Sequence, residues 1–140
     1  MITPDLTPEE AGPWLAAADK HQLDPVFLVA PSSTDARVAR IAGLCRGFVY
    51  ATSVLGVTGA RQQTSSAAPV LVDRVRAVTD LPVGVGLGVS TADQAAEVAG
   101  YADAVIVGSA FVRAVLAAGP AGAPAAAAAV AAELAAGVRR

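Results

Sequence analysis

Residues 82–110 carry the clearest fold signal in the chain, with the sequence PVGVGLGVSTADQAAEVAGYADAVIVGSA. Two short apolar runs, at 82–88 and 104–107, flank a segment in which Ala95, Val98 and Ala99 recur at helical spacing. Nearly unbroken apolar runs are typical of parallel strands that are buried on both faces. The stretch therefore predicts a strand–helix–strand unit whose two strands lie parallel in one sheet.

The same alternation continues toward the N-terminus. Apolar runs rich in Val, Phe and Tyr lie at 25–30 and 47–52, and the opening MITPD predicts the stub of a further strand. Strand and helix thus alternate about four times, at intervals of roughly 20 to 30 residues. This order favours a parallel sheet joined by right-handed crossovers.

Helical patterns separate the apolar runs, and several begin at a recognisable cap. The predicted N-terminal signals are Thr7 with Pro8 and Glu10, then Ser33 or Thr34, and then Ser90 with Asp93. The buried faces of two of these helices are predicted from Val38, Ile41, Ala42 and Cys45, and from Leu71, Val75 and Val78. The last helix is predicted from about Pro124 to Leu134.

Two architectures of the α/β class fit this order: a doubly wound open sheet, or an arc of a (β/α)₈ barrel. No linker divides the chain, so residues 1–140 are predicted to form one domain. Residues 117–140 are predicted to be an Ala-rich joint, over 117–125, followed by the terminal helix. The length is roughly half of the about 250 residues that a complete barrel needs.

Composition excludes several classes of protein. The chain has 54% hydrophobic residues, 16% charged residues and a net charge of -2, which argues against disorder and against a basic nucleic-acid-binding surface. Its one cysteine, Cys45, and one histidine, His21, exclude an intrachain disulfide and a Cys- or His-rich metal site. The acidic N-terminus lacks a secretory signal, and the apolar tail is mostly alanine. We therefore expect a cytoplasmic protein without a membrane span or a metal.

Glycines follow three of the predicted strands. Gly56 and Gly59 come after the run at 47–52, Gly88 ends the run at 82–88, and Gly108 and Ser109 follow the run at 104–107. Glycine lets a backbone approach a ligand closely, and helix N-termini direct unpaired N–H groups at anions. Because function in either architecture lies at the carboxyl ends of the strands, these glycines predict a phosphate site. The spacing does not match GxGxxG, so a dinucleotide site is not expected.

Six motifs occur in an order that resembles a known family. They are Pro4-Asp5-Leu6 with Pro8-Glu9-Glu10, Ala30-Pro31-Ser32-Ser33-Thr34-Asp35, Gly47-Phe48-Val49-Tyr50, Gly56-Val57-Thr58-Gly59-Ala60, Gly86-Leu87-Gly88-Val89-Ser90 and Gly108-Ser109-Ala110. Together they resemble the C-terminal half of the tryptophan synthase alpha subunit, up to about Leu116. The resemblance implies a partial (β/α)₈ TIM barrel that covers about strands 4/5 to 8.

The resemblance also implies a function. The family is a lyase of tryptophan biosynthesis, which cleaves indole-3-glycerol phosphate to indole and glyceraldehyde 3-phosphate by a retro-aldol reaction without a cofactor. Indole then passes to a beta subunit, which carries pyridoxal phosphate. Indole-3-glycerol phosphate and a tryptophan synthase beta subunit are thus the implied substrate and partner.

The motifs assign individual residues by resemblance. Backbone N–H groups of Gly59, Gly88, Gly108 and Ser109 would hold the substrate phosphate, and Leu87 would pack on indole. The implied supporting residues are Asp5 at the end of strand 4, the active-site tyrosine Tyr50 and the mobile-loop threonine Thr58. Each has a plainer alternative: Tyr50 as a core residue, Thr58 as a loop residue, and Asp5 as a capping residue. For Cys45, His21 and Trp14 we expect packing or capping roles.

Two departures from the family limit this interpretation. The glutamate and aspartate that perform its acid–base chemistry lie on the first two strands, which have no counterpart here, so no catalytic residue is retained. Val54 stands where the family commonly has arginine. We therefore expect a truncated chain that retains the phosphate-binding half of the lyase, with doubtful activity alone. The alternatives are self-association through open sheet edges and a non-catalytic half-barrel that binds phosphate or docks on a beta subunit.

Overall fold

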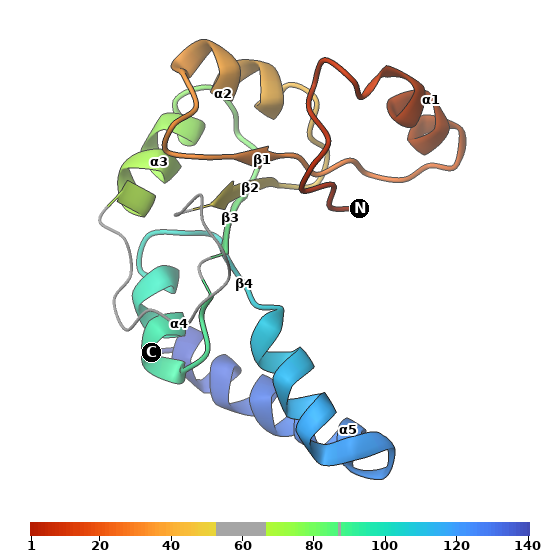
Figure 1. The fold of residues 1–140 in the computed structure, drawn as a ribbon. Helices are drawn as coiled ribbons and strands as arrows, with labels where there is room; N and C mark the ends of the chain where they lie inside the picture. The colour runs from red at the N-terminus through yellow and green to blue at the C-terminus, as the bar shows by residue number, and fades with distance from the viewer. Residues whose placement is uncertain (53–66, 87) are drawn as a thin grey trace.

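A computed structural model of the chain describes residues 1–52, 67–86 and 88–140. Its sheet contains β1 (Leu28–Val29), β2 (Val49–Thr52), β3 (Val83–Gly86) and β4 (Ala104–Ile106). All neighbouring strands are parallel, and their order is β1-β2-β3-β4 (Figure 1). A doubly wound sheet reverses its strand order at a switch point, whereas this order is sequential throughout. The observed topology therefore favours the arc of a barrel over the open sheet.

A fifth position of the sheet lies beside β1. Ile2 forms a parallel bridge with Val26. The Thr3 amide donates to the Val26 carbonyl at 3.1 Å, and the Val26 amide donates to the Met1 carbonyl at 2.9 Å. The strand stub predicted at the N-terminus is therefore confirmed, although it is a single bridge rather than a full strand.

Five helices accompany the strands in the part of the chain that the structure describes. They are α1 (Gly12–Lys20), α2 (Asp35–Ala42), α3 (Ala67–Arg76), α4 (Ala92–Ala99) and α5 (Ser109–Val138). Helices α2 to α5 line the outer side of the arc, and no helix of the described residues lies on the inner side (Figure 1). The chain is thus an α/β structure with one covered face and one open face.

Side-chain alternation along β2 and β3 distinguishes the two faces. Val49, Ala51, Val83 and Val85 are at most 1% exposed and belong to the core beneath the helices. Tyr50, which lies between two of them on β2, is only half-buried on the inner face. Successive side chains on a strand point to opposite faces. The valines of these strands therefore pack in the core on the outer face, while the side chains on the inner face are less completely buried.

The helix predicted to begin at Thr7 begins later. Residues 8–10 form turns, α1 starts at Gly12, and Thr7 donates a hydrogen bond from Oγ1 to Glu10 Oε2 at 2.9 Å. The later start places Pro13 in the first helical turn. Backbone amides in that turn have no acceptor within the helix, so the missing N–H of proline costs no hydrogen bond there. A helix from Thr7 would have placed Pro13 in its interior.

The terminal helix also differs from expectation. Residues 117–125 are helical except for one kink at Gly119, where φ is +67°, so α5 folds into two legs and the second leg begins earlier than the predicted start near Pro124. A glycine alone supplies that backbone conformation without strain, which is why one residue suffices to turn the helix. Pro120 is the first residue after the kink, where proline is tolerated, whereas Pro124 lies inside the second leg.

Helix α5 is long and apolar enough, by length and composition, to span a membrane, alone among the helices of the described ranges. Its hydropathy comes from alanine, and the kink at Gly119 divides it into shorter legs. Its second leg packs on α4: a side chain at Gly137 would meet the backbone of Ala92, and Arg140 pairs with Asp93. We interpret α5 as the terminal helix pair of the outer layer.

Several local predictions are confirmed. Thr34 caps α2 by accepting from the Arg37 amide, and His21 is the C-cap of α1. Trp14 packs edge-to-face on Phe27, with ring centroids 5.9 Å apart, and Cys45 is buried. The cap of α4 is Thr91 rather than Ser90, which instead donates to Gln94.

Candidate functional site

The glycines that follow β3 and β4 lie at the same level of the sheet. Gly86 is paired with Ile106 in the parallel register. Gly88 and Gly108 each come two residues after that pair, at the carboxyl ends of neighbouring strands. The fold therefore brings together two of the segments that the sequence singled out for phosphate binding.

Each of these glycines precedes a helix. Gly108 is the N-cap of α5, and no side chain caps that helix, so its first N–H groups are open to a ligand. Ser109 is the first residue of the helix and is exposed. By contrast, the Thr91 side chain already accepts from the Gln94 amide at the start of α4. The α5 terminus is thus the better anion site of the two.

Space is available around the glycines. A Cβ at Gly88 or Gly108 would meet nothing within 4 Å. Gly88 has φ +69°, a left-handed conformation that other residues rarely adopt. Both residues are exposed, so a ligand can reach their backbone.

Tyr50 extends across the inner face toward β3. A Cβ at Gly86 would overlap the Tyr50 hydroxyl and ring, so the tyrosine lies directly over that glycine. Burial raises the pKa of the Tyr50 hydroxyl, so that the group stays protonated at neutral pH and can donate a hydrogen bond. The tyrosine predicted from the sequence is therefore placed on the open face beside the glycine-bearing strands.

Asp5 lines a second part of the carboxyl edge. A cavity of about 180 Å³ is formed by residues 4–8, by β1 with the residues around it, and by Ser33, Arg37, Ile41 and Thr52. Asp5 is exposed at this cavity, and Thr52 donates from Oγ1 to the Val29 carbonyl at 3.3 Å. The arrangement puts a carboxylate on the inner strand ends, at the opposite end of the arc from Gly108.

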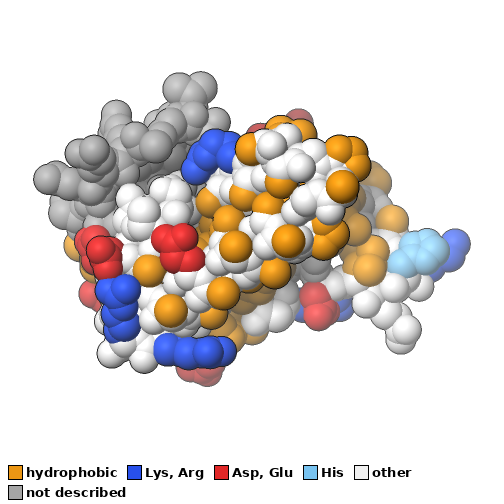
Figure 2. All heavy atoms as spheres, turned by 90° about the horizontal axis from the view of Figure 1, so that it is seen from below, with side chains coloured by type: hydrophobic (Ala, Val, Ile, Leu, Met, Phe, Trp, Pro, Cys, Tyr) orange, Lys and Arg blue, Asp and Glu red, His pale blue; other side chains and the backbone are white. Residues whose placement is uncertain are grey.

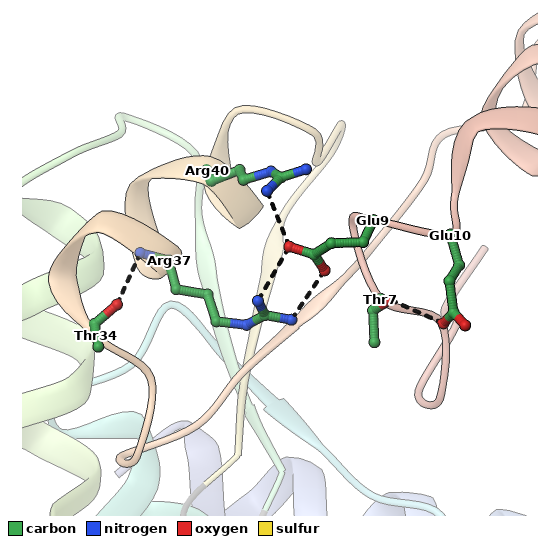
Figure 3. A network of polar contacts seen from close by, with 6 residues as sticks. All are labelled: Thr7, Glu9, Glu10, Thr34, Arg37 and Arg40. Atoms are coloured by element: carbon green, nitrogen blue, oxygen red, sulfur yellow. Dashed lines mark hydrogen bonds and ion pairs between the residues drawn. The ribbon is translucent and has the colours of Figure 1, made fainter.

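Ion pairs hold the segment that follows Asp5 in place. Glu9 accepts hydrogen bonds from both guanidinium nitrogens of Arg37, at 3.2 and 3.3 Å, and from Arg40 at 2.9 Å (Figure 3). A hydrogen bond with its own backbone and the bond from Arg37 lower the pKa of Glu9. The turn at residues 7–10 is thereby anchored on α2, beside the cavity that Asp5 lines.

Other carboxylates serve the structure elsewhere. Asp103 accepts from the Val83 amide and from Arg76, both at 2.8 Å, at the amino-terminal end of the strands. The hydrogen bond from Val83 lowers its pKa, and Arg76 adds to the effect. Among the described residues, no group of three His, Cys, Asp or Glu side chains could hold a metal ion.

Not every residue predicted from the sequence can be placed. Thr58, Gly59 and Leu87 lie outside the described residues. Conversely, Gly86 stands in one of the six motifs but was assigned no role, although glycines alternate at 84 and 86 on β3. That alternation was the available signal, because it puts both glycines on the face that carries Tyr50. Thr52 was missed because only the fold brings it to the cavity beside Asp5.

Comparison with known families gives a match over almost the whole chain. A family model described as tryptophan synthase alpha chain matches residues 1–138. The tryptophan synthase alpha chain of Acidothermus cellulolyticus is 68% identical over 140 residues, which are 100% of this chain and 52% of that protein. The corresponding protein of Mycobacteroides abscessus is 63% identical, with the same coverage. The chain therefore spans about half the length of these relatives.

Solved structures give the same result. A structure of Mycobacterium tuberculosis tryptophan synthase matches with a TM-score of 0.86 and 59% identity, covering 99% of this chain and 51% of that one. The tryptophan synthase A-subunit of Pyrococcus furiosus matches with a TM-score of 0.74 and 28% identity, covering 95% and 52%. The curvature of the arc is thus close to that of the matching part of a complete chain.

Proposed function

The chain belongs to the tryptophan synthase alpha chain family, and on that premise we propose that it supplies the phosphate-binding, C-terminal half of the lyase barrel. The observation that carries this proposal is the pair of glycine-bearing strand ends, Gly88 and Gly108, at one level of the sheet. The uncapped N-terminus of α5 stands beside them. Backbone N–H groups at such a place suit a phosphate ester.

The substrate follows from the family. Indole-3-glycerol phosphate carries a phosphate at one end and an indole ring at the other. In this proposal, Gly88, Gly108 and Ser109 hold the phosphate together with Gly59, and Leu87 packs against the indole. Tyr50 offers a protonated hydroxyl on the open face beside Gly86. Asp5 and Thr58 act as supporting residues rather than as catalysts.

The proposed half lacks its own acid–base pair. A retro-aldol cleavage needs one group to remove the proton from the glycerol hydroxyl and another to protonate the indole ring. At the described carboxyl edge, Asp5 is the acid that lines a cavity, and a single carboxylate cannot fill both roles. We therefore infer that activity requires the remaining part of the barrel, which supplies the missing carboxylates.

An indole-release assay tests this function. The chain alone is expected to release no indole from indole-3-glycerol phosphate above the rate in buffer. Mixed with the part of the Acidothermus cellulolyticus protein that it does not match, it is expected to release indole. A Gly108→Val substitution, which places a branched side chain at the proposed phosphate site, should abolish that gain. Indole release by the chain alone would contradict the proposal.

A second candidate is a binding module without chemistry. The open N-terminus of α5 favours it, because phosphate binding there needs no catalytic group. Such a half-barrel would bind a phosphate ester or dock on a tryptophan synthase beta subunit. Calorimetry with glycerol 3-phosphate, and co-purification with a beta subunit, separate the candidates. Binding without any indole release in the mixture would favour the second.

The remaining properties follow from the family. We propose a cytoplasmic protein of tryptophan biosynthesis that uses no cofactor of its own. Pyridoxal phosphate belongs to the beta subunit, which receives the indole.

A further inference from the structure

The segment that carries Asp5 is tied to the rest of the molecule on both sides. Before it, Thr3 joins the sheet beside β1 through a backbone hydrogen bond. After it, residues 7–10 form a turn, which is closed by the Glu10 amide on the Thr7 carbonyl at 3.1 Å and by the Thr7 hydroxyl on the Glu10 carboxylate. Asp5 lies between these two points, exposed at the cavity by the carboxyl end of β1. The place of its carboxylate therefore depends on what holds the turn.

Glu9 holds the turn on α2. Arg37 donates two hydrogen bonds to its carboxylate in a bidentate arrangement, and Arg40 donates a third. A single exposed ion pair adds little stability, whereas a bidentate pair within a network also fixes direction. Figure 3 shows Glu9 pointing out of its turn toward both arginines. The Asp5 carboxylate takes no part in these ion pairs and stays available to a ligand.

Arg37 stands at an unfavourable position of α2. Thr34 caps the helix and accepts from the Arg37 amide at 3.3 Å, so Arg37 lies three residues after the cap. A glutamate at that position would complete a capping box, whereas a cation in the first turn opposes the helix dipole. Arg40, by contrast, lies in the last turn, where a cation is favoured. Helix stability therefore does not explain an arginine at position 37, whereas its contact with Glu9 does.

The first turn of α2 is itself fixed from α3. Arg74 donates from Nε to the Asp35 carboxylate at 2.8 Å, and from its terminal nitrogens to two carbonyls of the loop that precedes α2. Its side chain is 27% exposed, so solvent screens these contacts less than it screens a fully exposed pair. Because Asp35 is the first residue of α2, this anchor sets the place from which Arg37 reaches Glu9.

Ion pairs elsewhere in the described ranges join elements that also share the apolar core. Arg140 pairs with Asp93 of α4, for example, while α4 and α5 both contribute buried side chains to that core. Figure 2 shows hydrophobic side chains spread over the α5 side of the molecule, with charged side chains toward its margins. In the turn at residues 7–10, by contrast, Glu9 and Glu10 are exposed. The turn thus depends more on its ion pairs than those helices do.

We propose that Arg37 is a positioning residue, which holds Glu9 and thereby fixes the Asp5 carboxylate at the carboxyl edge of the sheet. It acts through Asp5 and needs no contact with the ligand. Loss of its guanidinium leaves α2 folded and frees the segment of residues 4–10. This inference rests on the proposed function, in which Asp5 is a supporting residue.

NMR relaxation of the chain tests the anchor. Arg37→Glu completes the capping box but repels Glu9, so the melting temperature should change little. The amide order parameters of Asp5 and Leu6 should fall below about 0.6, while those of α2 stay near about 0.85. The matched control is Arg46→Glu, which removes an exposed arginine whose ion pairs lie at the amino-terminal end of the strands. A rigid Asp5 in Arg37→Glu, or an equal loss of order in the control, would overturn the inference.

Indole release separates positioning from a merely structural effect. The chain is mixed with the part of the Acidothermus cellulolyticus protein that it does not match. Arg37→Gln and Asp5→Ala should each lower kcat/KM several-fold, and the double variant should lose no more than Asp5→Ala alone. Additive losses would overturn the inference, because Arg37 would then act independently of Asp5. A mixture that releases no indole would overturn the proposed function alone, since the order of Asp5 in the chain still decides the role of Arg37.

Discussion

The two faces of one sheet differ in how completely the chain covers them. On the outer face Val49, Val83 and Val85 are fully buried beneath helices, whereas on the inner face Tyr50 is half-buried and no helix of the described ranges lies above it. The same strands thus contribute to a finished core and to an unfinished one. Burial of apolar area stabilises a fold, so the outer face carries most of the stability.

This difference indicates which face stabilises the fold and which face binds a ligand. The inner face and its carboxyl edge hold Tyr50, Gly88 and Gly108, which serve a ligand more than they serve packing. Substitutions on the outer face should therefore change stability. Substitutions on the inner face should change ligand binding. Those that also create a steric clash with a neighbouring side chain should change stability as well.

The largest effect is expected on the outer face. Leu71 on α3 is 1% exposed, and Leu71→Ala should lower the free energy of unfolding by about 2–5 kcal/mol, because it leaves a cavity in the core. Its neighbour Val70 is 59% exposed, and Val70→Ala should change stability by about 0.5 kcal/mol or less. Urea denaturation followed by circular dichroism measures both. Similar losses for the two variants would contradict a finished outer core.

The next effect tests the inner face. Gly86→Ala should cost about 1–3 kcal/mol, because its Cβ overlaps the Tyr50 hydroxyl. The double variant with Tyr50→Ala should recover much of this loss in a double-mutant cycle. Gly12→Ala is the control, since a Cβ there meets nothing within 4 Å and lies in a helix. Additive losses at positions 86 and 50 would mean that the two residues do not touch.

A smaller effect separates a structural cap from a ligand site. Thr34 caps α2, so Thr34→Ala should cost about 0.5–2 kcal/mol, while Thr34→Ser should keep the cap. Thermal melts of both variants make the measurement. A stability loss with serine equal to that with alanine would show that the hydroxyl is not the stabilising group.

The smallest effect is a pH dependence at the amino-terminal edge. The pKa of Asp103 is lowered from 3.8 on folding, chiefly by the Val83 amide and then by Arg76. Its stabilisation is therefore complete above the unfolded-state pKa and is lost as pH falls through the lower folded-state value. Asp103→Asn should flatten the acid limb of the stability curve below about pH 4. A steeper limb in the variant would contradict this assignment.

Much of this fold could be predicted from the sequence, because local physics decides it. The Val-rich runs mark the strands, and Thr34 and Gly108 mark helix starts. The start of α1 was predicted too early, and the start of the last leg, which follows the bend at Gly119, was predicted too late. In both, a single proline or glycine acts through its position within a turn, which composition alone does not give.

The site could be predicted only in part. Glycines at strand ends predict an anion site, and the resemblance to the family assigns Tyr50 to the active site. The overlap of Tyr50 with Gly86 depends on the register between two strands, which no local pattern contains. The approach of Thr52 to Asp5 likewise depends on the packing of separate segments.

The central claim is that the open carboxyl edge of this chain holds a phosphate ester. Its most direct test is an amide NMR titration with glycerol 3-phosphate, with glycerol as the control, of the chain mixed with the part of the Acidothermus cellulolyticus protein that it does not match. We expect shifts at Gly88, Gly108 and Ser109 with the phosphate ester alone, and none at Val70 on the outer face. Equal shifts with glycerol, or no response at those three amides at millimolar ligand, would contradict the claim.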